Sequence, residues 1–150
     1  MKYTITENNF TISTDKSKID IDYVHQFLSN SYWSPGVPMD TVKRALNGSL
    51  CFGVYENEKQ TLPTGRQVGY ARMITDTATF AYLADVFIDE NYRAKGLGKW
   101  LVKVILAHPD LQGLRRIILA TRDAHSLYAQ FGFVPFATPE RWMAYAPPQK

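Results

Sequence analysis

The stretch that decides the fold is Tyr82–Ile105, with the sequence YLADVFIDENYRAKGLGKWLVKVI. It continues a nearly all-apolar run over residues 79–88 that a single charge, Asp85, interrupts. Such a run, bounded by polar residues, is typical of a strand covered on both faces. After a polar turn, apolar residues recur at helical spacing: Leu97, Leu101, Val104 and Ile105. The pattern predicts a strand over 79–88, a tight turn, and a helix over 96–107 that ends before Pro109.

The start of this predicted helix has the features of an anion site. Gly96 and Gly98 would let a ligand approach bare main-chain N–H groups, where the helix dipole adds roughly half a positive charge. Lys95, Lys99 and Lys103 follow at i,i+4 spacing, where like charges repel unless a polyanion lies among them. With Arg93 beside the glycines, the pattern favours a phosphate site over a merely solvated helix face.

The spacing of the turn excludes two common phosphate loops and resembles a third. Neither G-x-x-x-x-G-K-[ST] nor G-x-G-x-x-G is present. The motif R-x-x-G-x-G, after a strand and before a helix, resembles the acyl-CoA-binding signature of the GNAT superfamily of N-acetyltransferases. A second block, DAHSLYAQFGF at 123–133, is similar to the family helix A-x-x-L-Y-x-x-x-G-F. The chain as a whole looks like a bacterial GNAT subgroup of uncharacterised substrate.

The resemblance implies that acetyl-CoA is the acyl donor and assigns residues to it. The pantetheine arm would contact main-chain groups of Val86, Phe87 and Ile88. The pyrophosphate would lie on the turn and helix start, formed by Arg93, Ala94, Lys95, Gly96, Leu97, Gly98 and Lys99. The family's tyrosine beside the thioester sulfur corresponds to Tyr128.

Acyl transfer to an amine needs a proton acceptor and a proton donor. An alkyl amine is mostly protonated at neutral pH, and the thiolate leaving group needs a proton. Tyr128 is the candidate acid, because a phenol stays protonated at pH 7. Asp85 is the candidate base, because burial of a carboxyl would raise its pKa. The alternatives are that Tyr128 only packs and that Asp85 is a structural carboxylate held by the backbone, Arg or Lys. His125 is a further candidate base.

Composition limits the class of protein. The chain has 150 residues, 45% hydrophobic, which suits one globular domain over 1–150. A net charge of +3 is too small for a nucleic-acid-binding surface to be expected. The single cysteine, Cys51, excludes an intrachain disulfide and is expected in the core. We expect no metal, because the histidines lack ligand spacing, and no membrane span or signal peptide, hence a cytoplasmic protein.

The remaining segments predict an α+β fold: a mixed, mostly antiparallel sheet flanked by helices, with a splayed parallel strand pair. Expected strands are 10–13 (an edge), 50–55, 67–74 and 115–120, with closing strands at 133–136 and 142–145. Helices are expected over 20–28 and 39–47, and another is expected to start at a cap on Asp123. A polar surface loop joins residues 56 and 67. The strand–helix–strand order across 79–120 implies a right-handed parallel crossover.

The acceptor is not specified beyond an amine, on a small molecule or a peptide. Candidates to line its pocket are Tyr32, Trp33, Tyr82 and Arg122; the aromatic residues would suit a cationic amine. The resemblance is also compatible with a homodimer. The alternative function is a non-catalytic acyl-CoA-binding sensor or a protein-interaction module, because a fold does not guarantee catalysis.

Overall fold

The computed structural model describes residues 2–57 and 65–148. The chain forms two compact units, Met1–Ala120 and Thr121–Lys150. The expected single domain over 1–150 stays a prediction, and each unit is described by itself. The predicted loop between residues 56 and 67 lies largely outside the described residues.

The first unit is built on a six-stranded sheet whose order along the sheet is the order along the chain. All neighbouring strands are antiparallel except the last two, which are parallel. The strands are β1 (Thr4–Glu7), β2 (Phe10–Ser13), β3 (Leu50–Glu56), β4 (Arg66–Thr75), β5 (Phe80–Ile88) and β6 (Arg116–Leu119). The predicted mixed sheet is confirmed. The prediction that residues 10–13 form an edge is wrong, because β1 pairs outside β2.

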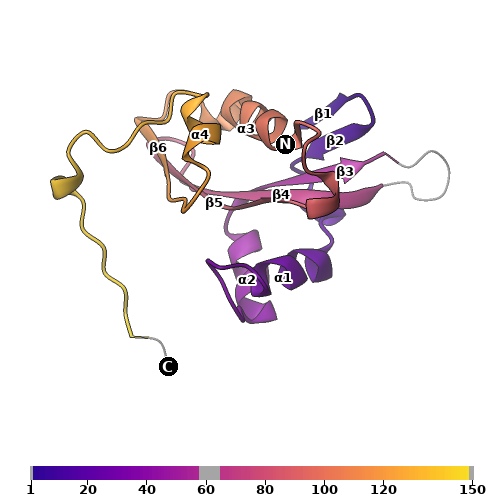
Figure 1. Ribbon diagram of the computed structural model, residues 1–150, viewed down its shortest axis with the longest axis horizontal. Coiled ribbons are helices and arrows are strands. Elements are labelled where there is room, and N and C mark those ends of the chain that lie inside the picture. The colour runs from indigo at the N-terminus through magenta and orange to yellow at the C-terminus, as the bar shows by residue number, and fades with distance from the viewer. Residues whose placement is uncertain (1, 58–64, 149–150) are drawn as a thin grey trace. The chain divides into compact units, whose positions relative to one another are not determined.

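Helices cover both faces of this sheet (Figure 1). α1 (Ile21–Ser29) and α2 (Met39–Asn47) lie on one face, and α3 (Leu97–Ala107) lies on the other. All three helices were expected from the sequence. Asp20 is the N-cap of α1, since its carboxylate accepts from the N–H of Tyr23. Short 3-10 turns lie at Lys16–Lys18, Glu90–Tyr92 and Pro109–Leu111.

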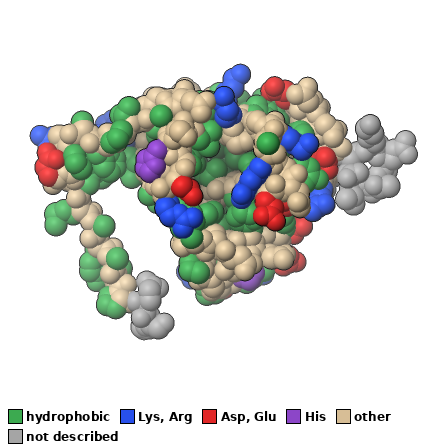
Figure 2. All heavy atoms as spheres, in the orientation of Figure 1, with side chains coloured by type: hydrophobic (Ala, Val, Ile, Leu, Met, Phe, Trp, Pro, Cys, Tyr) green, Lys and Arg blue, Asp and Glu red, His purple; other side chains and the backbone are tan. Residues whose placement is uncertain are grey.

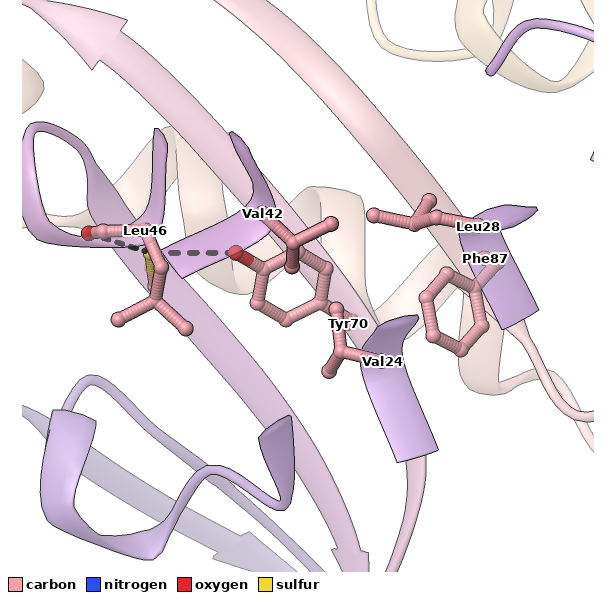
Figure 3. Packing of buried hydrophobic residues seen from close by; sticks show 7 residues of the cluster. Val24, Leu28, Val42, Leu46, Tyr70 and Phe87 are labelled. Atoms are coloured by element: carbon pink, nitrogen blue, oxygen red, sulfur yellow. Dashed lines mark hydrogen bonds between the residues drawn. The ribbon is translucent and has the colours of Figure 1, made fainter. Parts of the chain in front are cut away.

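The core between α1, α2 and the sheet is built around Tyr70 (Figure 3). Val24 and Leu28 of α1 pack with Val42 and Leu46 of α2 against this ring. Cys51 is buried here as expected, and its Sγ lies 3.4 Å from the Tyr70 hydroxyl. Burial raises the pKa of the Cys51 thiol and that of Tyr70. Both groups therefore stay neutral, and they act as packing residues in this core.

The second unit contains α4 (His125–Ala129) and a 3-10 turn at Pro139–Arg141. The closing strands predicted over 133–136 and 142–145 are wrong: the described residues 121–148 contain no strand. Alternating apolar residues form a strand only beside a paired neighbour, and prolines interrupt this segment. The predicted cap at Asp123 is wrong too. The N–H of Ala124 bonds to Thr121 Oγ1, and Asp123 pairs with Arg122 at 3.6 Å.

Candidate functional site

The parallel strands β5 and β6 part in the middle of β5. Their pairing runs from Phe80–Arg116 to Leu83–Leu119, where β6 ends. β5 continues to Ile88, so residues 84–88 have no paired strand on that side among the described residues of the first unit. The predicted splay is therefore present. An unpaired strand edge offers main-chain N–H and C=O groups to an extended ligand.

A β-bulge lies immediately beyond the last β5–β6 pair. Arg72 of β4 pairs with Ala84, and Tyr70 pairs with Phe87, so two residues of β5 oppose one residue of β4. The first of the two is Asp85, whose φ is +55°, in the left-handed region. A bulge of this kind usually has glycine at that position, and a non-glycine residue there costs about 1–2 kcal/mol. The bulge bends the strand and increases its twist, which favours its separation from β6.

The bulge overturns one expectation about side-chain direction. Strict alternation predicts that Asp85 lies on one face with both Leu83 and Phe87. Phe87 does share its face, since it packs in the core under α1 and α2, but Leu83 does not. Leu83 pairs with Met73, whereas Asp85 contacts Arg72, and neighbouring residues of β4 point to opposite faces. Asp85 therefore lies on the face covered by α1 and α2, opposite Leu83.

Both oxygens of the Asp85 carboxylate accept hydrogen bonds. Arg72 Nε lies 2.9 Å from Oδ2, and Trp33 Nε1, from the loop after α1, lies 2.9 Å from Oδ1. Arg72 also donates through Nη1 to Ser49 Oγ at 3.1 Å. The two charged side chains are only 16% and 11% exposed, so this is a largely buried ion pair. We call these three residues, Trp33, Arg72 and Asp85, the bulge triad.

Two members of the bulge triad, Arg72 and Asp85, line a small cavity between α1, α2 and the sheet. The cavity has a volume of about 80 Å³. Its sheet side is formed by Tyr70, Arg72 and Asp85, and most of its helical side is aliphatic: Leu28, Val37, Val42 and Ala45, with the Thr41 hydroxyl among them. It can hold a small apolar group with one polar end at Asp85 and Arg72.

The turn between β5 and α3 has the backbone of an anion-binding nest. Ala94 has φ +66° and Gly96 has φ +77°. Left-handed residues in a turn direct successive N–H groups into one concavity. Among the described residues, no acceptor is bonded to the main-chain N–H groups of residues 94–99, and α3 has no side-chain cap. These N–H groups lie at the positive end of α3, and the anion site predicted there stays a prediction.

Two tyrosine hydroxyls tie this turn to other elements of the first unit. The Tyr92 hydroxyl donates to Glu56 Oε1 at 2.7 Å, and this bond raises the pKa of Tyr92. The Tyr23 hydroxyl of α1 donates to Asp89 Oδ2 at 3.1 Å. Burial, and then the Asp89 charge, raise the pKa of Tyr23. The turn is therefore anchored to both β3 and α1, which fixes it relative to the open edge of β5.

The other predicted site residues lie in different places. Phe87 is in the core, where its ring stacks on Phe27 with centroids 3.7 Å apart. Its main chain pairs with Tyr70 of β4, and the Phe87 carbonyl oxygen lies beside Gly69 of that strand. Tyr32 contacts the Trp33 ring, and Tyr82 pairs with Ile74, which puts it on the same sheet face as Arg72. In the second unit, Tyr128 is buried and packs edge-on against Phe133.

Several expected absences can be compared with the described residues. No group of three or more metal-ligating side chains occurs among them, and none of their helices is long and apolar enough to cross a membrane.

On the face in Figure 2, Lys and Arg side chains are interspersed with acidic ones. Lys95, Lys99 and Lys103 are exposed, as a solvated helix face or a polyanion site would require.

Arg72 and Ser49 are site residues that were not predicted from the sequence. One signal was available: Arg72 is a charge in the otherwise apolar segment 67–74, as Asp85 is in 79–88. Two such charges in neighbouring strands predict a buried ion pair when the strands are paired. The register of that pairing was needed to bring them together.

A parallel strand pair that ends midway along β5, a bulge beside that end, and a glycine nest at the next helix match the fold that the sequence resemblance implies. The comparisons identify the family. The model of the acetyltransferase (GNAT) domain matches residues 47–135. The chain is 33% identical over 141 residues to a Gibberella zeae protein named "Putative acetyltransferase FG08082", covering 83% of this chain and 78% of that protein. The chain belongs to the GNAT acetyltransferase family.

Solved structures agree with this assignment. A GNAT-family protein of Xanthomonas campestris pv. campestris is 44% identical, with a TM-score of 0.85 and coverage of 95% of this chain and 96% of that chain. Glucosamine-6-phosphate N-acetyltransferase of Arabidopsis thaliana is 18% identical, with a TM-score of 0.61 and coverage of 93% and 99%. At that identity the likeness concerns the fold alone.

Proposed function

We propose that this protein transfers the acetyl group of acetyl-CoA to a primary amine by direct attack on the thioester. The observation that carries the proposal is the continuity of two features in the first unit. The open edge of β5 over residues 84–88 leads directly into the nest at Ala94 and Gly96. An extended arm along the edge and a diphosphate on the nest match the two chemically distinct parts of coenzyme A.

The chain's own groups supply binding and proton transfer in this reaction. Main-chain groups of the segment Val86, Phe87 and Ile88 are proposed to hold the pantetheine arm and to polarise the thioester carbonyl. Donors fixed before the reaction stabilise the charge that develops on the carbonyl oxygen. Tyr128 is proposed to give its phenolic proton to the departing thiolate.

The acceptor is proposed to bind on the α1–α2 face of the sheet, in the cavity that Arg72 and Asp85 line. The cavity's volume of about 80 Å³ suits a small amine with a short apolar substituent. Tyr32 and Trp33, whose rings contact each other, are proposed to bind the acceptor as well, because aromatic faces suit a cationic amine. Tyr82 shares this sheet face and is proposed to contact the acceptor. Arg122, in the second unit, is also proposed to contact it.

Calorimetric titration with acetyl-CoA and with CoA tests the donor site. We expect one site per chain, and we expect Gly96→Asp combined with Gly98→Asp to abolish binding while the protein stays folded. Gly113→Asp is the matched control, since Gly113 has φ +78° and open space around it, as Gly96 has, but lies outside the turn. Equal affinity in the double variant and the wild type would refute the site.

A thiol-release assay with a panel of primary amines then tests the reaction. Release of CoA that depends on the amine supports the transferase. Tight binding of acetyl-CoA without release to any amine would favour the alternative, a non-catalytic acyl-CoA-binding sensor.

A further inference from the structure

The bulge in β5 has an unfavourable residue at its left-handed position. Asp85 occupies φ +55°, where glycine is the usual residue. Aspartate and asparagine tolerate this region better than other non-glycine residues, because their short side chains bond locally. The Asp85 carboxylate makes no local bond: its two oxygens accept from the α1–α2 loop and from β4. Contacts with two other elements therefore hold this backbone conformation.

We infer that the bulge triad is a backbone lock: Arg72 and Trp33 hold Asp85 in its left-handed conformation and so keep the edge of β5 open. Arg72 and Trp33 are positioning residues, and Asp85 acts through its backbone. The link to catalysis rests on the proposed function, since the open edge is where the acyl donor would bind.

Three observations support a lock over a proton acceptor. The bulge begins two residues after the last β5–β6 pair, Leu83–Leu119, so it lies at the point of separation. Arg72 is itself fixed by Ser49, which leaves little freedom for the guanidinium to move away from the carboxylate. Both charges are largely buried, so a loss of either partner would leave the other uncompensated. Both oxygens of Asp85 accept hydrogen bonds from the protein itself, whereas a general base needs an oxygen within reach of the substrate's proton.

The decisive variants remove both charges together, because Arg72 alone would be a buried unpaired cation. The combination of Arg72→Met with Asp85→Gly, the Gly double variant, has a residue at position 85 that accepts φ +55°. Arg72→Met with Asp85→Ala has the same charge change but a residue that disfavours this conformation. The lock predicts that the Gly version retains the wild-type affinity for acetyl-CoA and that the Ala version binds about tenfold more weakly, since fewer molecules have the open edge.

The first measurement is hydrogen–deuterium exchange of the amides over residues 84–88, which needs no ligand and no reaction. We expect faster exchange there in Trp33→Phe, which keeps the ring but loses the donor, and in the Ala double variant. The Gly double variant should match the wild type. Arg44→Met is the control, because Arg44 pairs with Asp40 on the surface, where both side chains are more than two-thirds exposed. Unchanged exchange in Trp33→Phe and in the Ala double variant would refute the lock.

The second measurement is the pH dependence of kcat/KM for amine acetylation in the Gly double variant, which leaves no unpaired buried charge. The lock predicts that the acidic limb of the profile persists with the same midpoint. A general base at Asp85 predicts that this limb disappears and that kcat falls by about 10²-fold or more in both double variants; that result would overturn the inference. If the wild type acetylates no amine, the proposed reaction fails, and the exchange measurement still decides the lock.

Discussion

Replacement of Gly98 by alanine should separate the stability of this protein from its affinity for CoA. Gly98 is the second residue of α3, and an added Cβ there meets no atom within 4 Å. Alanine is favoured over glycine in a helix by about 0.5–1 kcal/mol. We therefore expect the ligand-free Gly98→Ala protein to unfold about 1–4 °C higher than the wild type.

The same methyl group should weaken CoA binding. The N–H groups of residues 94–99 have no bonded acceptor in the described chain, and the proposed diphosphate must come close to them. A Cβ inserted at a tightly packed contact costs about 1–3 kcal/mol, or roughly ten- to a hundredfold in affinity. Stability and affinity should therefore change in opposite directions.

Two comparison variants make the test specific. Gly96→Ala places a methyl group at φ +77°, and this strain alone should lower the free energy of unfolding by about 1–2 kcal/mol. The same methyl group should also lower the affinity for CoA. Gly113→Ala carries similar strain, at φ +78°, outside the site and should lower stability alone. The assays are thermal unfolding without ligand and calorimetric titration with CoA. Wild-type affinity for CoA in Gly98→Ala would refute the close approach of the ligand to this turn. A lower melting temperature of Gly98→Ala than of the wild type would refute the placement of Gly98 in the first turn of α3.

Three further predictions concern single side chains. Tyr128→Phe should lower kcat more than it raises KM in amine acetylation; unchanged kcat would remove Tyr128 from the acid role. Tyr92→Phe loses the bond to Glu56 and should weaken CoA binding several-fold in calorimetry, whereas Glu56→Gln, which keeps an acceptor, should bind normally. His108 is buried, and burial lowers its pKa, so the unfolded chain takes up the proton first as the pH falls below about 6.5. Full stability is therefore expected above that pH, with a loss below it that His108→Asn reduces. Asparagine keeps an acceptor for the N–H of Asp110, and urea unfolding at pH 7.5 and 5.5 measures the difference. Equal loss in both proteins would contradict the role of His108.

The part of the fold that depends on local signals could be predicted from the sequence. The glycines at 96 and 98 fix the start of α3, and apolar spacing of about 3.6 residues fixes its buried face. The strand–helix–strand order then requires the parallel β5–β6 pair. Each of these inferences uses a spacing of a few residues, where the geometry of the chain leaves few alternatives.

The parts that depend on pairing could not be predicted. Residues 133–136 and 142–145 alternate like strands but lack a paired strand in the second unit. β1 was missed because a four-residue segment with one apolar side chain, Thr4–Glu7, carries little signal unless its pairing with β2 is known. The site residue Arg72 was missed for the same reason, since its partner lies thirteen positions later in the chain.

Asp85 shows what a lone charge in an apolar strand can mean. From the sequence, a proton acceptor and a structural carboxylate were both open, and alternation wrongly assigned the side chain to the face of Leu83. The register adds a fact that neither interpretation used: an extra residue in β5, which puts Asp85 at φ +55°. A charged side chain that bonds two other elements can stabilise such a backbone, whereas glycine only permits it. Because the bulge also coincides with the end of β6, the charge marks where the sheet opens. A charge of this kind in a related sequence, paired with an arginine in the preceding strand, should therefore predict the position of the bulge.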